Sequence, residues 1–170
     1  IQKCLELLIE AGTAEKDIIL LHCNTEYPTP DVDVNLLAIR DLREHFPQVA
    51  IGFSDHSVGC VAAIGAAVLG ISLIEKHFTL DKNLPGPDHK ASATPEELRL
   101  LVNNVRRIET MAGCGHKIVT ESERKNKIIA RKSIVARNAI KKGEVFSADN
   151  ITCKRPGNGI SPMFWYEIIG

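Results

Sequence analysis

The sequence predicts an α/β fold followed by a small β-rich module, and three observations predict it. Short apolar runs begin near residues 18, 49 and 71, and a helical pattern follows each run. Such alternation is typical of a parallel sheet covered by helices. Polar residues follow each run directly, and short strand-like segments replace the pattern after Gly113. Three parallel strands cannot close a barrel, so the first part is predicted to be a piece of either a TIM barrel or an open doubly wound sheet.

The composition is that of an ordinary globular protein. Of 170 residues, 44% are apolar and 25% are charged, which excludes disorder, collagen and coiled coil. Lysine plus arginine number 21, as do aspartate plus glutamate, so neither nucleic acid nor a membrane is expected as a partner. The five cysteines are scattered and form no Cys-x-x-Cys pair. They favour a reducing compartment, and we expect a cytoplasmic protein.

The first unit of the sheet is predicted within residues 1–46. Residues 1–11 have the pattern of an amphipathic helix that ends at Gly12. The nearly continuous apolar run 18–23 predicts a strand that is buried on both faces. Apolar residues at helical spacing predict a helix over 34–46, which ends before Pro47.

Two further units follow in the same order. Residues 49–53 and 71–75 predict buried strands, and the small residues of 58–69 predict the helix between them. This stretch is apolar enough to suggest a membrane span, but its glycines and its change of period favour a helix followed by a strand. Thr94 and Glu97 have the spacing of a capping box, which predicts the start of another helix.

The chain is predicted to contain two domains joined by a linker. The α/β part is expected to occupy residues 1–112. Residues 113–130 are polar, basic and weakly patterned, which predicts a linker or an extended arm. Residues 131–170 contain the strand-like runs SIVA, NAIKKGEVF and NITCKRPGNG, which predict the small β-rich module.

Polar residues cluster where each predicted strand ends. In a TIM barrel and in a doubly wound sheet alike, the carboxyl ends of the strands form the face that binds ligands. The residues at these ends that could carry chemistry are Asn24, Thr25 and Tyr27 after the first strand, Ser54 and His56 after the second, and Glu75 and His77 after the third.

His56 and His77 occupy equivalent positions in neighbouring units. Adjacent strands lie about 5 Å apart, so the two imidazoles could share a divalent metal such as Mn²⁺ or Fe²⁺. The alternative is that each imidazole hydrogen-bonds a loop backbone. His22 precedes its strand end by one residue, and we interpret it as a core histidine with a satisfied hydrogen bond.

Four other residues have both a functional and an ordinary interpretation. Cys23 could be a nucleophile, but a cysteine in an apolar run is more often a small core residue. Ser54 could donate to a phosphate or cap the next helix. Asp88 follows Pro-Gly-Pro, which could fix its carboxylate for hydroxyl recognition or form a plain turn. Arg155 lies in KRPGNG, where a surface arginine is the default interpretation.

The segments LLHCNTEYPTP, IGFSDHS, EKHFTLDKNLPGPDH and KRPGNG, in this order, closely resemble the sialic acid synthase family. The resemblance implies the last three βα units of a TIM barrel followed by an antifreeze-like (SAF) domain, both incomplete in this chain. It implies an N-acetylneuraminate synthase, which condenses phosphoenolpyruvate with N-acetylmannosamine and water and releases phosphate by C–O cleavage. Because the family's earlier strands supply part of the phosphoenolpyruvate site, we expect this chain alone to be inactive.

The resemblance also implies roles for individual residues and a partner subunit. A divalent metal, Mn²⁺ or else Mg²⁺ or Co²⁺, would bind between two histidines, and an arginine from the SAF domain would enter the partner's site in a domain-swapped homodimer. The implied roles are metal binding for His56 and His77, catalysis for Glu75, phosphoenolpyruvate binding for Ser54 and for Asn24 or Thr25, and sugar binding for Tyr27, Asp88 and Arg155.

Three alternatives remain beside this prediction. The sugar could be the 2,4-diacetamido-6-deoxy hexose that gives legionaminic acid, or the precursor of another nonulosonic acid. The enzyme could be another metal-dependent TIM-barrel aldol enzyme. The SAF-like tail could bind carbohydrate or ice without catalysis, although its many basic residues suit an acidic substrate or a subunit interface better than ice.

Overall fold

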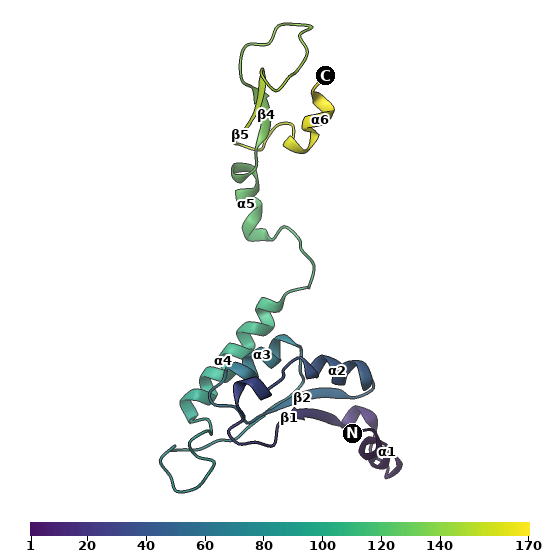
Figure 1. Ribbon diagram of the computed structural model, residues 1–170, viewed down its shortest axis with the longest axis vertical. Helices are drawn as coiled ribbons and strands as arrows, with labels where there is room; N and C mark the ends of the chain where they lie inside the picture. The colour runs from purple at the N-terminus through teal and green to yellow at the C-terminus, as the bar shows by residue number, and fades with distance from the viewer. The chain divides into compact units, whose positions relative to one another are not determined.

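The computed structural model describes all 170 residues, which form two compact units, Ile1–Gly115 and His116–Gly170 (Figure 1). The first unit holds a three-stranded sheet with helices, and the second holds a pair of strands with shorter helices. In neither unit is a helix both long and apolar enough to cross a membrane.

The sheet of the first unit is parallel, which confirms the α/β prediction. Its strands are β1 (Ile19–Cys23), β2 (Ala50–Asp55) and β3 (Ile74–Lys76), in the order β1-β2-β3. The predicted third strand, 71–75, is thus shorter and begins later. The register aligns Cys23 with Ser54 and Ser54 with Glu75, so polar groups meet at the carboxyl edge.

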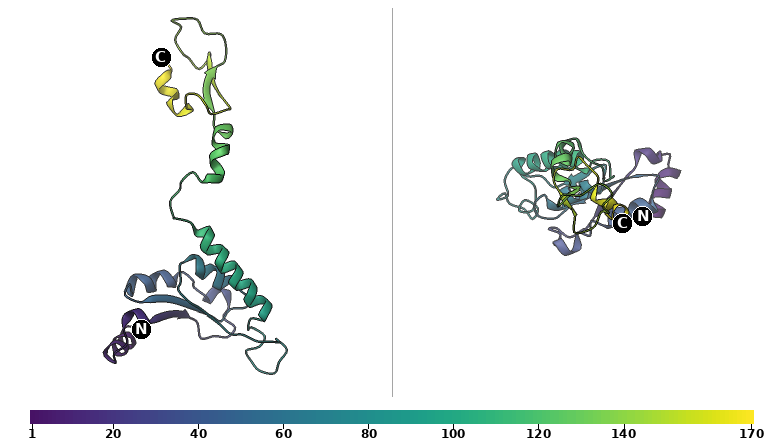
Figure 2. Two further views of the ribbon diagram at one scale, coloured as in Figure 1. Left: turned by 180° about the vertical axis from the view of Figure 1, so that it is seen from behind. Right: turned by 90° about the horizontal axis from the view of Figure 1, so that it is seen from above.

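Four helices belong to this unit: α1 (Gln2–Glu10), α2 (Ala38–His45), α3 (Val61–Val68) and α4 (Pro95–Ala112). The two views in Figures 1 and 2 agree that α2, α3 and α4 lie on one side of the sheet. The prediction of a helix from residue 34 was wrong at its start, because a 3₁₀ turn over Asp31–Asp33 comes first and Asn35 has a left-handed backbone, φ 47°.

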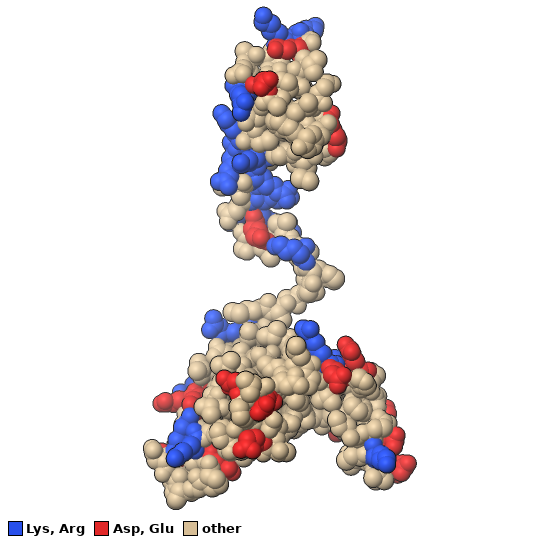
Figure 3. All heavy atoms as spheres, in the orientation of Figure 1, with Lys and Arg blue, Asp and Glu red and all other residues tan.

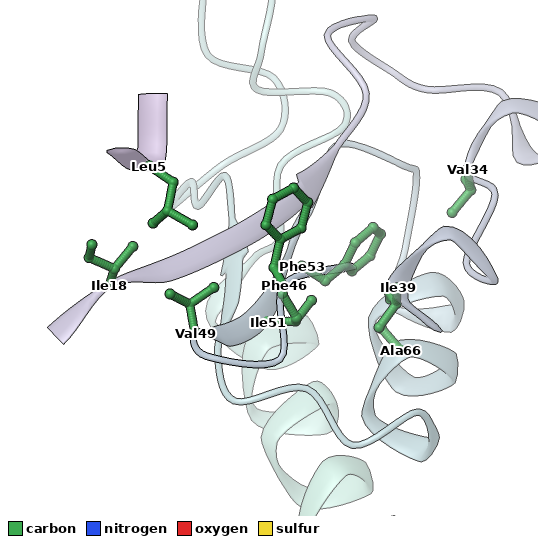
Figure 4. Close-up of a cluster of buried hydrophobic side chains, with 9 residues drawn as sticks. All are labelled: Leu5, Ile18, Val34, Ile39, Phe46, Val49, Ile51, Phe53 and Ala66. Atoms are coloured by element: carbon green, nitrogen blue, oxygen red, sulfur yellow. The ribbon is translucent and has the colours of Figure 1, made fainter. Parts of the chain in front are cut away.

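The core fills the space between β2 and the helices. Ile39 of α2 packs with Ile51 and Phe53 of β2, and all three side chains are at most 3% exposed (Figure 4). β2 is buried along nearly its whole length, as predicted. β1 is not: it lies at the edge of the three-stranded sheet, and Ile19 is 40% exposed. The prediction of a buried strand therefore holds for β2. It is wrong for β1 and β3, which contain no fully buried residue.

The second unit contains α5 (Glu121–Ala130), the antiparallel strands β4 (Ser133–Ala136) and β5 (Ile151–Lys154), a 3₁₀ turn and the short helix α6 (Trp165–Ile168). The stretch predicted as an extended linker therefore contains a helix. The run NAIKKGEVF forms turns and no strand. Its glycine, Gly143, has φ +86°, which suits a turn.

Candidate functional site

The two faces of the sheet carry different polar groups at its carboxyl edge. Side chains alternate along a strand, so Ser54 and Glu75 share one face while Asp55 and Lys76 share the other. We call the first the site face and the second the helix face, because Lys76 lines a pocket with Leu98 and other residues of α4. On the site face, Ser54 Oγ donates a hydrogen bond to Glu75 Oε1 at 2.6 Å.

The two histidines extend this site face beyond the strand ends. The rings of His56 and His77 are 5.1 Å apart between centroids and nearly perpendicular, at 80°. His56 Nδ1 lies 2.7 Å from the backbone oxygen of Asn24. A carbonyl only accepts hydrogen bonds, so Nδ1 carries a proton, and in the neutral ring Nε2 has the lone pair that a ligand would use.

Tyr27 packs against both histidines. Its ring is stacked on His77 at 4.2 Å and meets His56 edge-on at 5.2 Å. Its hydroxyl donates to the backbone oxygen of Asp88 at 3.3 Å and is 3.2 Å from Ser92 Oγ. Burial raises the pKa of the Tyr27 phenol, and the nearby Asp88 carboxylate raises it further. Tyr27 is therefore a neutral donor that joins the loop after β1 to the loop after β3.

The loop after β3 places Asp88 beside His77. Asp88 Oδ2 lies 3.6 Å from His77 Nδ1, and the Asp88 side chain remains 53% exposed. Ser92 Oγ donates to the Asp88 carbonyl at 2.8 Å, which supports this end of the loop. The Asp88 carboxylate therefore faces both solvent and the ring of His77.

Asn24 and Thr25 differ in how the loop after β1 uses them. The Asn24 side chain accepts a hydrogen bond from the Glu26 backbone at 2.8 Å and donates to the Asp33 carbonyl at 3.4 Å. The Asn24 side chain thus holds the loop. Thr25 is exposed.

A buried ion pair lies on the helix face, directly behind the histidines. Lys76 Nζ donates to Asp55 Oδ2 at 2.9 Å and to the backbone oxygen of Ser57 at 2.8 Å. Asp55 Oδ1 accepts from the Ser57 backbone at 2.9 Å and from its hydroxyl at 2.6 Å. The sequence interpretation missed this network. Its only trace in the sequence is that Asp55 precedes His56 and the oppositely charged Lys76 precedes His77.

Three residues that the sequence analysis considered, His22, Cys23 and Arg155, have other surroundings. His22 Nε2 donates to the Val34 carbonyl at 2.8 Å and its ring stacks on Phe53, so its hydrogen bond is satisfied as predicted, although the side chain is half-buried and lies outside the core. The interpretation of Cys23 as a core residue was wrong, because it lies at the end of β1 and is exposed. Its Sγ is 3.8 Å from His56 Nδ1. Arg155 belongs to the second unit, where its Nε donates to the Ala130 carbonyl at 2.9 Å.

Arg155 lies in a basic stretch of that unit. Figure 3 shows Lys and Arg side chains gathered over α5 and the strands that follow. All of these side chains are exposed, and they are Arg124, Lys125, Lys127, Arg131, Lys132, Lys154 and Arg155.

The donor set can supply part of a metal site. Across the whole chain, no group of three or more His, Cys, Asp or Glu side chains is arranged to hold a metal. Two neighbouring imidazoles are present, and the lone pair of His56 Nε2 is available. Such a pair fits a divalent ion whose other ligands are oxygens of substrate, water or residues outside this chain.

Comparison with known proteins identifies both units. Residues 1–117 match the NeuB family, and residues 131–170 match the SAF domain. The whole chain is 49% identical to an N,N'-diacetyllegionaminic acid synthase of Campylobacter jejuni, of which it covers 51%. It is 37% identical to the N-acetylneuraminate-9-phosphate synthase of Homo sapiens over 88% of the chain and 42% of that protein.

Solved structures agree with these matches. The crystal structure of the N-acetylneuraminic acid (sialic acid) synthetase of Leptospira borgpetersenii superposes with a TM-score of 0.65 at 36% identity, over 74% of this chain and 43% of that one. This chain thus spans about half the length of the relatives that it matches.

Proposed function

Since the chain belongs to the NeuB family, we propose that it forms part of a nonulosonic acid synthase, which condenses phosphoenolpyruvate with an N-acetylated amino sugar. The observation that carries the proposal is the site face, where two neighbouring imidazoles lie beside the hydrogen-bonded pair of Ser54 and Glu75. Both substrates carry several oxygens, and these side chains could bind them at the ligand-binding edge of the sheet.

We propose that His56 and His77 hold a divalent metal, with Mn²⁺ as the first candidate and Mg²⁺ or Co²⁺ as alternatives. When bound, such an ion polarises the carbonyl of the open-chain sugar as a Lewis acid. His56 is prepared for this role because its Nδ1 proton is fixed on the Asn24 carbonyl. Tyr27 fixes the ring of His77 by stacking.

The proposed reaction forms one C–C bond and one C–O bond from water, and it breaks the C–O bond to phosphate. The methylene carbon of phosphoenolpyruvate attacks the aldehyde carbon of the sugar, whose oxygen gains a proton. Water then adds to the resulting oxocarbenium carbon, and phosphate leaves with the C–O electron pair as that carbon becomes the keto group. The water oxygen becomes the keto oxygen, and the two protons of water go to the sugar oxygen and to the phosphate. The Glu75 carboxylate orients the sugar and stabilises the developing positive charge. Tyr27 and Asp88 contact the sugar from the two loops.

The phosphate-binding role of Ser54 requires a change of partner. A serine hydroxyl has one proton to donate, and Glu75 accepts it in this structure. Donation to the phosphate of phosphoenolpyruvate therefore turns the hydroxyl away from Glu75 and frees that carboxylate for the sugar. Either Asn24 or Thr25 would add a second contact, and the exposure of Thr25 supports the latter.

The identity of the sugar substrate is a separate part of the proposal. N-acetylmannosamine, the substrate predicted from the sequence, would give N-acetylneuraminate. The 49% identity to a diacetyllegionaminic acid synthase supports the 2,4-diacetamido-6-deoxy sugar as a second candidate. Phosphate release by the full-length protein should be measured with phosphoenolpyruvate, Mn²⁺ and each sugar in turn. Turnover with one sugar assigns the substrate, and no turnover with any N-acetylated hexosamine would contradict the proposed reaction.

Arg155 is proposed to complete the site of a partner subunit in a domain-swapped homodimer. If so, an Arg155→Ala protein and a His56→Ala protein, each nearly inactive, should regain activity when their subunits are mixed and allowed to exchange. One intact site per mixed dimer would form, containing His56 from one subunit and Arg155 from the other. Mixed dimers without any recovered activity would exclude the swap.

A further inference from the structure

The buried ion pair on the helix face joins the two strand ends that carry the histidines. Asp55 is the last residue of β2 and precedes His56, whereas Lys76 is the last residue of β3 and precedes His77. The pair bridges neighbouring strands in register at 2.9 Å. Its two side chains are 0% and 4% exposed, so solvent does not compete for these hydrogen bonds.

The same network fixes the backbone on the far side of His56. Asp55 Oδ1 accepts both the backbone N–H and the hydroxyl of Ser57, and Lys76 donates to the Ser57 carbonyl. His56 is therefore held between two residues that are bonded to one buried cluster. The loop after β1 adds a further bond, from Thr29 N to the His56 carbonyl at 2.9 Å.

We propose that Asp55 and Lys76 are positioning residues that set the separation and direction of the two imidazoles for metal binding. The inference rests on the proposed role of His56 and His77 as metal ligands. Neither member of the ion pair is a proposed ligand, because both side chains are used in the buried network on the face opposite Ser54 and Glu75. Their effect passes through the backbone of residues 55–57 and 76–77.

The test is the affinity for Mn²⁺ in the full-length protein, measured by titration with the electron paramagnetic resonance signal of free Mn²⁺. Lys76→Met leaves Asp55 buried without its partner and is expected to destabilise the fold as well. The decisive variant is therefore the double substitution Asp55→Asn with Lys76→Met. It removes both charges, so the net charge near the metal is unchanged and stability is restored at least in part.

The folded double variant is expected to bind Mn²⁺ about 10- to 100-fold more weakly, the usual effect of losing residues that orient metal ligands. A matched control is Lys82→Met, which breaks another short ion pair of this unit. Lys82 Nζ lies 2.6 Å from Glu97 Oε1 at the start of α4, and neither residue hydrogen-bonds the strand ends that carry the histidines. This variant should bind Mn²⁺ as the wild type does.

Two results would overturn the positioning role. One is wild-type affinity for Mn²⁺ in a folded double variant, and the other is equal weakening by Lys82→Met. His56→Ala separates this failure from that of the proposed metal site. If His56→Ala abolishes Mn²⁺ binding and the double variant does not weaken it, the positioning role alone is wrong. If His56→Ala binds Mn²⁺ as the wild type does, the metal site is wrong and the positioning role falls with it.

Discussion

At the carboxyl ends of β2 and β3, the two faces of the sheet differ in how far their polar groups are buried. Each face has a serine that donates to a carboxylate at 2.6 Å, Ser54 to Glu75 on the site face and Ser57 to Asp55 on the helix face. Asp55 is fully buried and also pairs with Lys76, whereas Glu75 is exposed. The two serines are equally buried, at 4% and 3% exposed, so the two bonds differ in the exposure of the carboxylate that accepts them.

This difference indicates which polar groups are available to bind a ligand. Buried polar groups must be satisfied inside the protein, and the helix face meets this demand in full. On the site face, His56 Nε2 keeps its lone pair, and Ser54 and Glu75 could exchange their mutual bond for bonds to a ligand. We expect substitutions on the helix face to change stability first, and substitutions on the site face to change activity first.

The largest expected effect is the loss of activity in His56→Ala or His77→Ala. Removing a ligand of a metal that contributes several kcal/mol to the transition state should lower the Mn²⁺-dependent rate by about a thousandfold or more. The fold should persist, because both histidine side chains are only half-buried and their removal leaves no cavity in the core. The rate of phosphate release and the thermal midpoint of unfolding check the two parts of this prediction.

The control for this pair is His45→Ala. His45 is at the end of α2, where its side chain is 66% exposed and its partner is Asp41 of the same helix. Its removal should leave the rate unchanged. If His56→Ala retains wild-type activity, the assignment of the metal ligands is wrong.

The two serines provide the sharpest test of the comparison between the faces. Ser57→Ala removes a buried donor to a charged carboxylate, so the free energy of unfolding should fall by about 1.5–3 kcal/mol. Ser54→Ala should cost less than about 1 kcal/mol, since the Glu75 carboxylate can turn to water. Ser54→Ala should instead raise the KM for phosphoenolpyruvate.

Urea unfolding and steady-state kinetics of the full-length protein measure these two effects. Equal losses of stability in the two variants would show that burial does not distinguish the faces. An unchanged KM for phosphoenolpyruvate in Ser54→Ala would remove Ser54 from the proposed phosphate site.

Two helix starts show how much of the fold the sequence could predict. The capping box of Thr94 and Glu97 precedes a long amphipathic pattern, and α4 begins there as predicted. Thr120 and Glu123 have the same spacing, and Glu123 accepts hydrogen bonds from the backbone N–H and the hydroxyl of Thr120 at 2.9 Å. This second start was missed because α5 has no buried residue. Local capping identifies a helix even where no apolar face supports it.

Some features of the candidate site could also be predicted from the sequence, and others could not. The positions of His56 and His77 follow from chain order, because parallel strands place their carboxyl ends along one edge. The contacts of Tyr27 with both rings and the ion pair of Asp55 with Lys76 do not, since they depend on how loops and helices pack. The opposite charges before the two histidines suggest the ion pair only after the register of β2 and β3 is known.

The smallest expected effect concerns an ion pair that is only half-buried. It tests whether burial determines how much a polar contact contributes to the free energy of unfolding. Lys82 and Glu97 are 2.6 Å apart, but their side chains remain 32% and 34% exposed. Glu97→Gln should therefore lower the free energy of unfolding at pH 7 by only about 0.5–1 kcal/mol. Glu96→Gln removes the same charge from the same turn without an ion pair, and its effect should be smaller.

The direction of the pKa shift of Glu97 predicts how the effect of Glu97→Gln on stability changes with pH. The hydrogen bond from Lys82 and the bond from the Thr94 backbone lower the pKa of the Glu97 carboxyl in the folded protein. The ionised form thus stabilises the fold above the unfolded pKa of about 4.3, and this contribution is lost as the pH falls through the folded pKa. The stability difference between wild type and Glu97→Gln, measured by urea unfolding, should shrink as the pH falls from 7 into this acidic range. A difference that grows on acidification would contradict the assignment. A loss at pH 7 as large as that of Ser57→Ala would show that burial does not separate the contacts of Asp55 from the half-buried pair of Lys82 and Glu97.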